Sequence, residues 1–397
     1  MKAMTRVVLV GLALVGLVGG TGILWLRASP YWAGVTLFAK DHRIENFRAM
    51  DQVFPGLEVP TGTDLWELPL ALGSLPEVFS LDGVDQSVAD FLAETSTTGL
   101  LVLQEGRIVH EEYRLGASET SRFTSFSVAK SVLSALIGVA LAEGHIDRLN
   151  DQIVAYVPAL KGSAYEGVTI SQALQMSSGV RFGEDYDNPF SDVNRLTFAL
   201  AFGQDLEAIL AGLDRERPPG EARSYASVDT IALGLVLTAA TGMPNEAYLA
   251  DRLWRPMGAE ADAFWNTGRA GAVLPHCCLN ARLRDYARFG QLFLDGGRRG
   301  DLQILPEAWV ARSTRPSAPP ATPSSAWPIS YGYQWWVPER PGNRFVAIGI
   351  WGQYIYVDRA KRVVIVKTSA DPGFDTRDRA TIALFHAIAH HVRANPS

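Results

Sequence analysis

The clearest apolar pattern in the chain is the run from Val132 to Leu141, which is hydrophobic almost all the way round a helical projection. A helix without a polar face is typical of a protein core rather than of the surface. Gly144 follows the run and is a residue suited to ending a helix. The pattern therefore predicts a buried helix that begins a few residues before Val132 and ends before Gly144.

A second uncharged run extends from Val7 to Leu26, with Lys2 and Arg6 before it and Arg27 after it. About 20 helical residues at a rise of 1.5 Å span about 30 Å, the thickness of a bilayer core. The positive charges on the amino side predict that the rest of the chain is exported. Two interpretations stay open. The length and the closing arginine favour an uncleaved anchor in the cell membrane, with the following domain on the periplasmic side; a cleaved signal peptide of a secreted protein is the alternative.

Strand patterns occur at both ends of the remaining chain. The segments Leu100–Gln104 and Arg107–Tyr113 flank Glu105-Gly106, a combination that predicts a β-hairpin. Four more segments rich in aromatic and β-branched residues predict strands near the carboxyl end: 331–336, 344–350, 353–357 and 362–368.

The middle of the chain has helical patterns. Thr169 is a suitable N-cap for a short helix that ends before Ser178-Gly179, and Ser227 is a suitable N-cap for an apolar helix over 231–240. Further helices are expected over 192–213, from 243 to about 294, and over 376–392.

Strands at both ends with helices between them predict an α/β (α+β) fold, in which an antiparallel sheet flanked by helices carries an inserted, mostly helical lobe. The expected organisation is a membrane anchor or signal sequence at 1–27, an extended arm at 28–84, and one domain at 85–395. Within that domain we assign 85–125 and 325–395 to the sheet part and 145–300 to the helical part.

Composition narrows the function. The 397 residues carry a net charge of −6 and contain no cluster of basic and aromatic residues, so nucleic-acid binding is not expected. The two cysteines, Cys277 and Cys278, are neighbours and close no useful loop, so we predict two small, free, apolar side chains instead of a disulfide. His386 and His390 lie four residues apart on the last predicted helix, but no third ligand accompanies them, and no metal or cofactor is expected.

Ser127 and Lys130 stand at the head of the buried helix. Residues three apart in a helix are neighbours on its surface, so the hydroxyl and the amine are within reach of each other. Only six of the 36 basic residues are lysines, and lysine, unlike arginine, can lose its proton when it is buried. Two interpretations follow: a serine nucleophile activated by an amine, or a structural lysine whose apolar stem is buried and whose amine reaches water.

Further motifs follow Ser127-x-x-Lys130 in order. They are Met176-Ser-Ser-Gly179, Glu184-Asp-Tyr186, Tyr225-Ala-Ser227 and Gly352-Gln-Tyr-Ile355. Together they resemble the penicillin-recognising serine hydrolases, over about residues 85 to 395. This family includes class C β-lactamases, D-Ala-D-Ala carboxypeptidases, esterases of β-lactamase fold and 6-aminohexanoate-dimer hydrolase, and the chain is most similar to the last branch.

The resemblance implies roles for individual residues. Ser127 would be the nucleophile that forms an acyl-enzyme, Lys130 would accept its proton, and Tyr225 would pass a proton to the leaving group. Tyr186 matches a tyrosine that contacts substrate. The remaining residues that we assign to substrate binding are Ser227, Gly349, Trp351 and Gln353.

An oxyanion hole needs two backbone N–H groups that point to the developing charge. We expect one from Ser127, near the amino end of its helix, and the other from Ile350, at the end of the strand over 344–350. On this strand Ala347-Ile348-Gly349 stands where the lactamases carry Lys-Thr-Gly, whose lysine and threonine bind a substrate carboxylate.

The sequence therefore predicts a serine hydrolase that cleaves small esters or linear amides, resembling 6-aminohexanoate-dimer hydrolase. Two alternatives stay open. One is a β-lactamase or D-Ala-D-Ala peptidase of the cell envelope; the other is a non-catalytic binding or scaffold protein that retains the pocket. Intact Ser127, Lys130 and Tyr225 argue against the scaffold.

Overall fold

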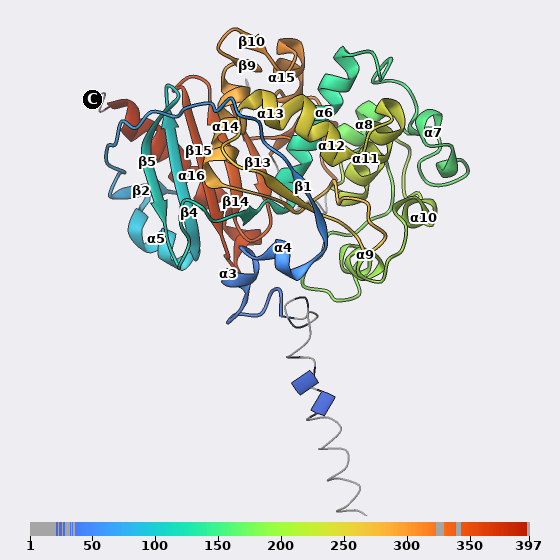
Figure 1. Ribbon diagram of the computed structural model, residues 1–397, viewed down its shortest axis with the longest axis horizontal. Coiled ribbons are helices and arrows are strands. Elements are labelled where there is room, and N and C mark those ends of the chain that lie inside the picture. Colours follow the sequence, from blue (N-terminus) through green and yellow to red (C-terminus); the bar gives the residue numbers. More distant parts are fainter. Residues whose placement is uncertain are drawn as a thin grey trace, which may run out of the picture.

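The computed structural model describes residues 36–322, 329–338 and 343–394, together with single positions between 21 and 34. Its centre is a seven-stranded antiparallel sheet with a lobe of helices beside it (Figure 1). The strand order is β11-β12-β13-β14-β15-β4-β5. The strands are β4 (Thr97–Gln104), β5 (Arg107–Tyr113), β11 (Ser330–Tyr331), β12 (Trp336–Val337), β13 (Arg344–Gly349), β14 (Gln353–Asp358) and β15 (Val363–Ser369). The predicted fold class, an antiparallel sheet flanked by helices with a helical lobe, is confirmed.

Side chains alternate between the two faces of the sheet along each strand. Both faces are buried, each in a different hydrophobic core. On β4, Leu101 and Leu103 face the core that contains α14 (Leu283–Leu294). Leu100 and Val102 face the opposite core, with α5 (Val88–Glu94) and α16 (Phe374–Ala394). Two helical layers therefore cover this sheet.

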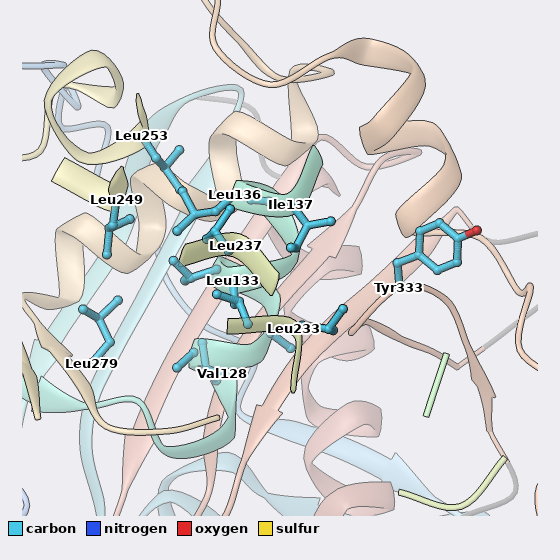
Figure 2. Packing of buried hydrophobic residues seen from close by; sticks show 14 of the residues in the cluster. Val128, Leu133, Leu136, Ile137, Leu233, Leu237, Leu249, Leu253, Leu279 and Tyr333 are labelled. Atoms are coloured by element: carbon cyan, nitrogen blue, oxygen red, sulfur yellow. The ribbon is translucent and has the colours of Figure 1, made fainter. Parts of the chain in front are cut away.

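The helix α6 (Ala129–Ala142) is the predicted buried helix, and its residues from Ala129 to Ala140 are all buried. It packs against α11 (Ser227–Thr241) through leucines and an isoleucine (Figure 2). Gly138 lies against the ring of Trp309 in α15 (Glu307–Ser313), where even a β-carbon would come within 2.4 Å of the ring. The helix α6 is therefore enclosed between the sheet part and the helical lobe.

Several local predictions are confirmed. The hairpin joins β4 and β5 across Glu105-Gly106. Thr169 caps α8 (Ile170–Leu174) in a capping box with Gln172. The last helix, α16, covers the predicted 376–392.

Other predictions need correction. The helix expected over 192–213 is two helices, α9 (Asp192–Ala201) and α10 (Leu206–Ala211), because Asp205 caps a new helix. The segment expected to be helical up to residue 294 contains β7 (Ala263–Asn266) and β8 (Leu279–Ala281), besides α12 (Asn245–Leu249), a π-helical turn (Ala250–Trp254) and α13 (Arg255–Met257). The strand expected over 331–336 is two short strands with a turn between them.

The strands β7 and β8 belong to a second sheet of order β1-β7-β8-β6. Its outer strands are β1 (Gly56–Val59) and β6 (Phe123–Thr124). Because β6 ends three residues before Ser127, this sheet holds the turn that leads into the buried helix. The rest of the segment before residue 97 forms α3 (Arg43–Asn46), α4 (Met50–Val53) and a hairpin of β2 (Val78–Leu81) and β3 (Val84–Ser87).

The run from Val7 to Leu26, which predicts an anchor or a signal peptide, lies outside the described residues apart from single positions. In the described part of the chain, no single helix has both the length and the apolar character needed to cross a membrane. Among the described residues, one bent pair of helices, Ser227–Thr241 and Asn245–Met257, meets that test by length and composition, and α11 in this pair is a core helix. The anchor therefore stays a prediction.

Candidate active site

Ser127 lies in a 3₁₀ turn, Phe126–Val128, that connects β6 to α6. Phe126 has a φ of +42°, a left-handed conformation that is uncommon for a bulky residue. The neighbours Phe126 and Val128 are buried, whereas Ser127 is half-buried. The sharp turn thus leaves one hydroxyl accessible within an otherwise closed core.

The amine of Lys130 points at this hydroxyl. Its Nζ donates hydrogen bonds to Ser127 Oγ at 2.9 Å, to Ser227 Oγ at 3.0 Å and to the carbonyl of His276 at 2.9 Å. Burial lowers the pKa of Lys130 to about 8, although the nearby charge of Glu184 acts in the opposite direction. With a pKa of about 8, roughly a tenth of this amine is neutral at pH 7 and about half at pH 8. The interpretation of Lys130 as a snorkelling lysine does not fit, because the side chain is only 1% exposed.

The carbonyl of His276 is held in place by the loop that follows it. Ser125 fixes this loop from the other side: its N–H donates to the carbonyl of Leu279, and the Leu279 N–H donates back to Ser125 Oγ. Cys277 and Cys278 form a disulfide between neighbours, so the prediction of free cysteines is wrong. Cys278 has a left-handed conformation with a φ of +67°.

Tyr225 lies beside the amine, with its ring centroid 5.2 Å from Lys130 Nζ. Its ring stacks on Trp336, with centroids 5.5 Å apart, and Tyr331 contacts it edge-on. Burial raises the pKa of Tyr225 well above its ordinary value, and the Ser127 hydroxyl acts against this rise. Tyr225 is therefore a neutral phenol, with a proton to give, across the whole physiological range.

Glu184 is a site residue to which the sequence analysis assigned no role. Its Oε1 accepts a hydrogen bond from the Ser227 N–H at 2.5 Å, and its Oε2 accepts one from the Tyr186 hydroxyl at 2.6 Å. It is also the carboxylate whose charge raises the pKa of Lys130. Its place in Glu184-Asp-Tyr186, one of the motifs behind the resemblance, was the only signal in the sequence.

Ser227 and Tyr186 both lie at the site, but their contacts there differ from those that the sequence predicted. Ser227 is the first residue of α11 and not its N-cap, which is Ala226; its hydroxyl is taken up by Lys130. Tyr186 contacts Phe374, and its hydroxyl is bonded to Glu184. Both side chains lie at the site and are arranged around the Lys130–Glu184 pair.

Gly349 brings β13 against the turn of Ser127. A β-carbon at this position would lie 2.4 Å from the carbonyl oxygen of Ser125 and 3.1 Å from the nitrogen of Ser127. Within the described part of the chain, neither the Ser127 N–H nor the Ile350 N–H has a hydrogen-bond partner. The structure therefore brings the two expected oxyanion donors to one place and leaves both of them free.

Two of the residues assigned to substrate binding have other contacts. Gln353 is buried and points inward: its Nε2 donates to the carbonyls of Ser369 at 2.7 Å and Trp351 at 3.1 Å. Its amide is used within the protein in this structure, and the assignment of Gln353 to substrate binding stays a prediction. Trp351 follows Ile350, but its ring stacks on Phe38 with centroids 5.5 Å apart, and Arg43 lies over it.

No group of three or more histidine, cysteine, aspartate or glutamate side chains is arranged to hold a metal ion among the described residues. What the site offers is a hydroxyl, an amine of lowered pKa, a neutral phenol and two free N–H groups. This set can transfer an acyl group.

We expect Gly349→Ala to destabilise the protein. The backbone oxygen that a new methyl group would meet cannot rotate away, so β13 and the Ser127 turn must separate. The free energy of unfolding, measured in urea, should fall by about 1–3 kcal/mol. Gly268→Ala is the matched control, because its β-carbon would meet nothing closer than 3.5 Å. An unchanged stability of Gly349→Ala would contradict the close approach.

Comparison with known proteins agrees with this geometry. The family model described as Beta-lactamase matches residues 84–388. The 6-aminohexanoate-dimer hydrolase of Paenarthrobacter ureafaciens is 30% identical over 315 residues, which cover 76% of this chain and 80% of that protein.

Solved structures show the same fold. A candidate 6-aminohexanoate-dimer hydrolase from Bacillus anthracis has a TM-score of 0.82 at 24% identity, covering 91% of this chain and 97% of that one. A family VIII carboxylesterase has a TM-score of 0.61 at 18% identity, covering 76% of this chain and 94% of that one. The match over most of its length and the fold together show that the chain belongs to the Beta-lactamase family, as a hydrolase-related member of it.

Proposed function

We propose that this protein is a serine hydrolase that cleaves small esters or linear amides through an acyl-serine intermediate on Ser127. The observation that carries the proposal is the hydrogen bond of 2.9 Å between Lys130 Nζ and Ser127 Oγ, made by a buried amine whose pKa is lowered to about 8. An amine of this pKa can accept a proton near neutral pH, and it is already in contact with the atom that must lose one.

The geometry supports the following acylation step. Neutral Lys130 accepts the proton of Ser127 as Oγ attacks the substrate carbonyl carbon. The carbonyl oxygen gains the negative charge and is stabilised by the N–H groups of Ser127 and Ile350. When the tetrahedral intermediate collapses, Tyr225 donates its proton to the departing alcohol or amine and regains one from Lys130.

Deacylation uses the same groups in reverse. Tyr225 accepts a proton from the attacking water while it passes its own proton to neutral Lys130, and the water oxygen bonds to the acyl carbon. Lys130 then returns this proton to Ser127 Oγ as the acyl–oxygen bond breaks, which restores all three groups. Glu184 favours the protonated form of Lys130 that exists between these transfers, because its negative charge raises the pKa of Lys130.

The preference for esters and linear amides over β-lactams is supported by β13. Ala347 is buried and offers no cation to a substrate carboxylate. Arg344, at the far end of the strand, pairs with the carboxylate of Asp358 at 2.9 Å. The relative that is 30% identical is named for a 6-aminohexanoate dimer, which is consistent with a linear substrate. A non-catalytic scaffold would have no use for a buried amine that must be desolvated.

A fluorophosphonate probe tests the acyl-serine chemistry directly. The full-length protein should become covalently labelled at Ser127, as detected by mass spectrometry of the modified peptide. Ser127→Ala should not react, whereas Ser118→Ala, at an exposed serine, should react like the wild type. A folded wild-type protein that stays unlabelled would show that the pocket is not catalytic.

The pH dependence of turnover tests the role of Lys130. Because the neutral amine is the base, kcat/KM for an ester should rise with pH and level off above an apparent pKa of about 8.

Lys130→Arg retains the charge but cannot lose its proton, so it should lower kcat/KM at least about 100-fold. Glu184→Gln removes the charge that raises the pKa of Lys130, and should move the profile to lower pH. Near-normal activity of Lys130→Arg would make the lysine structural.

Substrate preference separates the proposed activity from that of a lactamase. We expect kcat/KM for p-nitrophenyl butyrate to exceed that for nitrocefin, whose carboxylate must lose water without a partner on β13. A missing charged partner costs about 2–4 kcal/mol, or roughly 30- to 1000-fold. Nitrocefin turnover equal to or above that of the ester would favour the alternative, a β-lactamase or peptidase.

A further inference from the structure

A second buried lysine lies behind the candidate oxyanion hole. Lys367 is on β15, where it pairs with Tyr354 of β14, and its side chain is 1% exposed. Lys130 is the other fully buried lysine in the described part of the chain. The mechanism proposed above uses Lys130 but gives no role to Lys367.

Lys367 Nζ donates a hydrogen bond to the hydroxyl of Ser369 and lies 5.8 Å from the centre of the Tyr354 ring. Burial lowers the pKa of Lys367 to about 7; Asp371 and, more weakly, Asp378 act against this, and Arg377 acts with it. The amine is therefore largely neutral above that pH. Neither carboxylate is bonded to it: Asp371 accepts from Arg377, and Asp378 accepts from the Tyr354 hydroxyl.

Ser369 connects this lysine to the turn that carries Ile350. Its N–H donates to Gln353 Oε1 at 3.3 Å, and its carbonyl accepts from Gln353 Nε2 at 2.7 Å. The same Nε2 lies 3.4 Å from the carbonyl of Ile350 and 3.1 Å from that of Trp351. One buried amide thus joins β15 to the turn.

The side chain of Ser369 also packs directly under this turn. A β-carbon on Gly352, which has a φ of +83°, would lie 3.1 Å from Ser369 Cβ and 3.4 Å from its hydroxyl. Trp351, the residue before it, is left-handed at φ +62°, a conformation that a tryptophan adopts only when its surroundings hold it there. The position of the Ser369 hydroxyl therefore limits where the turn can lie.

We propose that Lys367 is a positioning residue for the oxyanion hole: by holding the Ser369 hydroxyl beneath the turn 350–352, it keeps the Ile350 N–H aimed at the substrate oxygen. This inference rests on the proposed function. Stability gives no reason for a lysine here, since an apolar side chain of similar volume would fill the space without the cost of burying an amine. Because an oxyanion donor acts on the transition state more than on the bound substrate, its displacement lowers kcat with little effect on KM.

The test uses Lys367→Met in the full chain, with an ester substrate and with phenylboronic acid, an inhibitor that forms a tetrahedral adduct on serine. We expect kcat to fall roughly 10- to 100-fold at nearly constant KM. The inhibition constant of the boronic acid should rise by a similar factor, while the midpoint of thermal unfolding stays the same or increases. Lys161→Met, at an exposed lysine, is the matched control and should leave all four values unchanged.

Ser369→Ala provides a second route that leaves the lysine in place. It should reproduce the loss of kcat, and the double variant should be no worse than either single variant, because both remove the same contact. This variant decides the question if Lys367→Met does not fold. Wild-type kcat in Lys367→Met or in Ser369→Ala, or losses that multiply in the double variant, would overturn the inference while the proposed function stands. A wild-type protein that reacts with neither ester nor boronic acid would overturn both.

Discussion

The site depends on one physical constraint, the burial of the Lys130 amine. A buried ammonium or amine is costly unless its protons find acceptors, and the turn that leads into α6 supplies only the Ser127 hydroxyl. The other two acceptors come from Ser227, which lies 97 residues after Lys130, and from His276, which lies 146 residues after it. Satisfying one amine therefore brings together the start of α6, the start of α11 and the loop before β8.

The same burial sets the chemistry. With fewer water molecules around it, the amine loses its proton more easily, and Glu184 limits how far its pKa falls. The phenol of Tyr225 responds to burial in the opposite way and keeps its proton. One apolar environment thus places a base and an acid side by side, because their charged forms have opposite sign.

The candidate oxyanion hole depends on the close approach of two backbone segments. The seven-stranded sheet delivers Gly349 to the Ser127 turn, and the missing side chain allows contact at a distance that any other residue would prevent. The turn beyond it has a left-handed tryptophan, and Gln353 and Ser369 support it from below. The two N–H groups thus come from the backbone, and side chains only support the turn that carries one of them.

Sequence reasoning was most successful where the evidence is local. The buried helix, the hairpin at Glu105-Gly106 and the Thr169 cap each depend on neighbours within a few residues. It failed for β7 and β8, because strands of four and three residues are too short to show a period and take their partners from distant parts of the chain.

The candidate site also divides into features that local sequence predicts and features that depend on contacts between distant residues. The sequence by itself determined that Ser127 and Lys130 share one end of an apolar helix, because a spacing of three fixes their proximity. It also showed the ordered motifs that identify the family. Only the tertiary structure decided that Glu184 faces Lys130, that Gln353 points inward and that Lys367 lies behind the turn of Ile350. The physical reason is that the pKa and the direction of a buried polar side chain are set by its partners, and here most of those partners come from other strands, helices or loops.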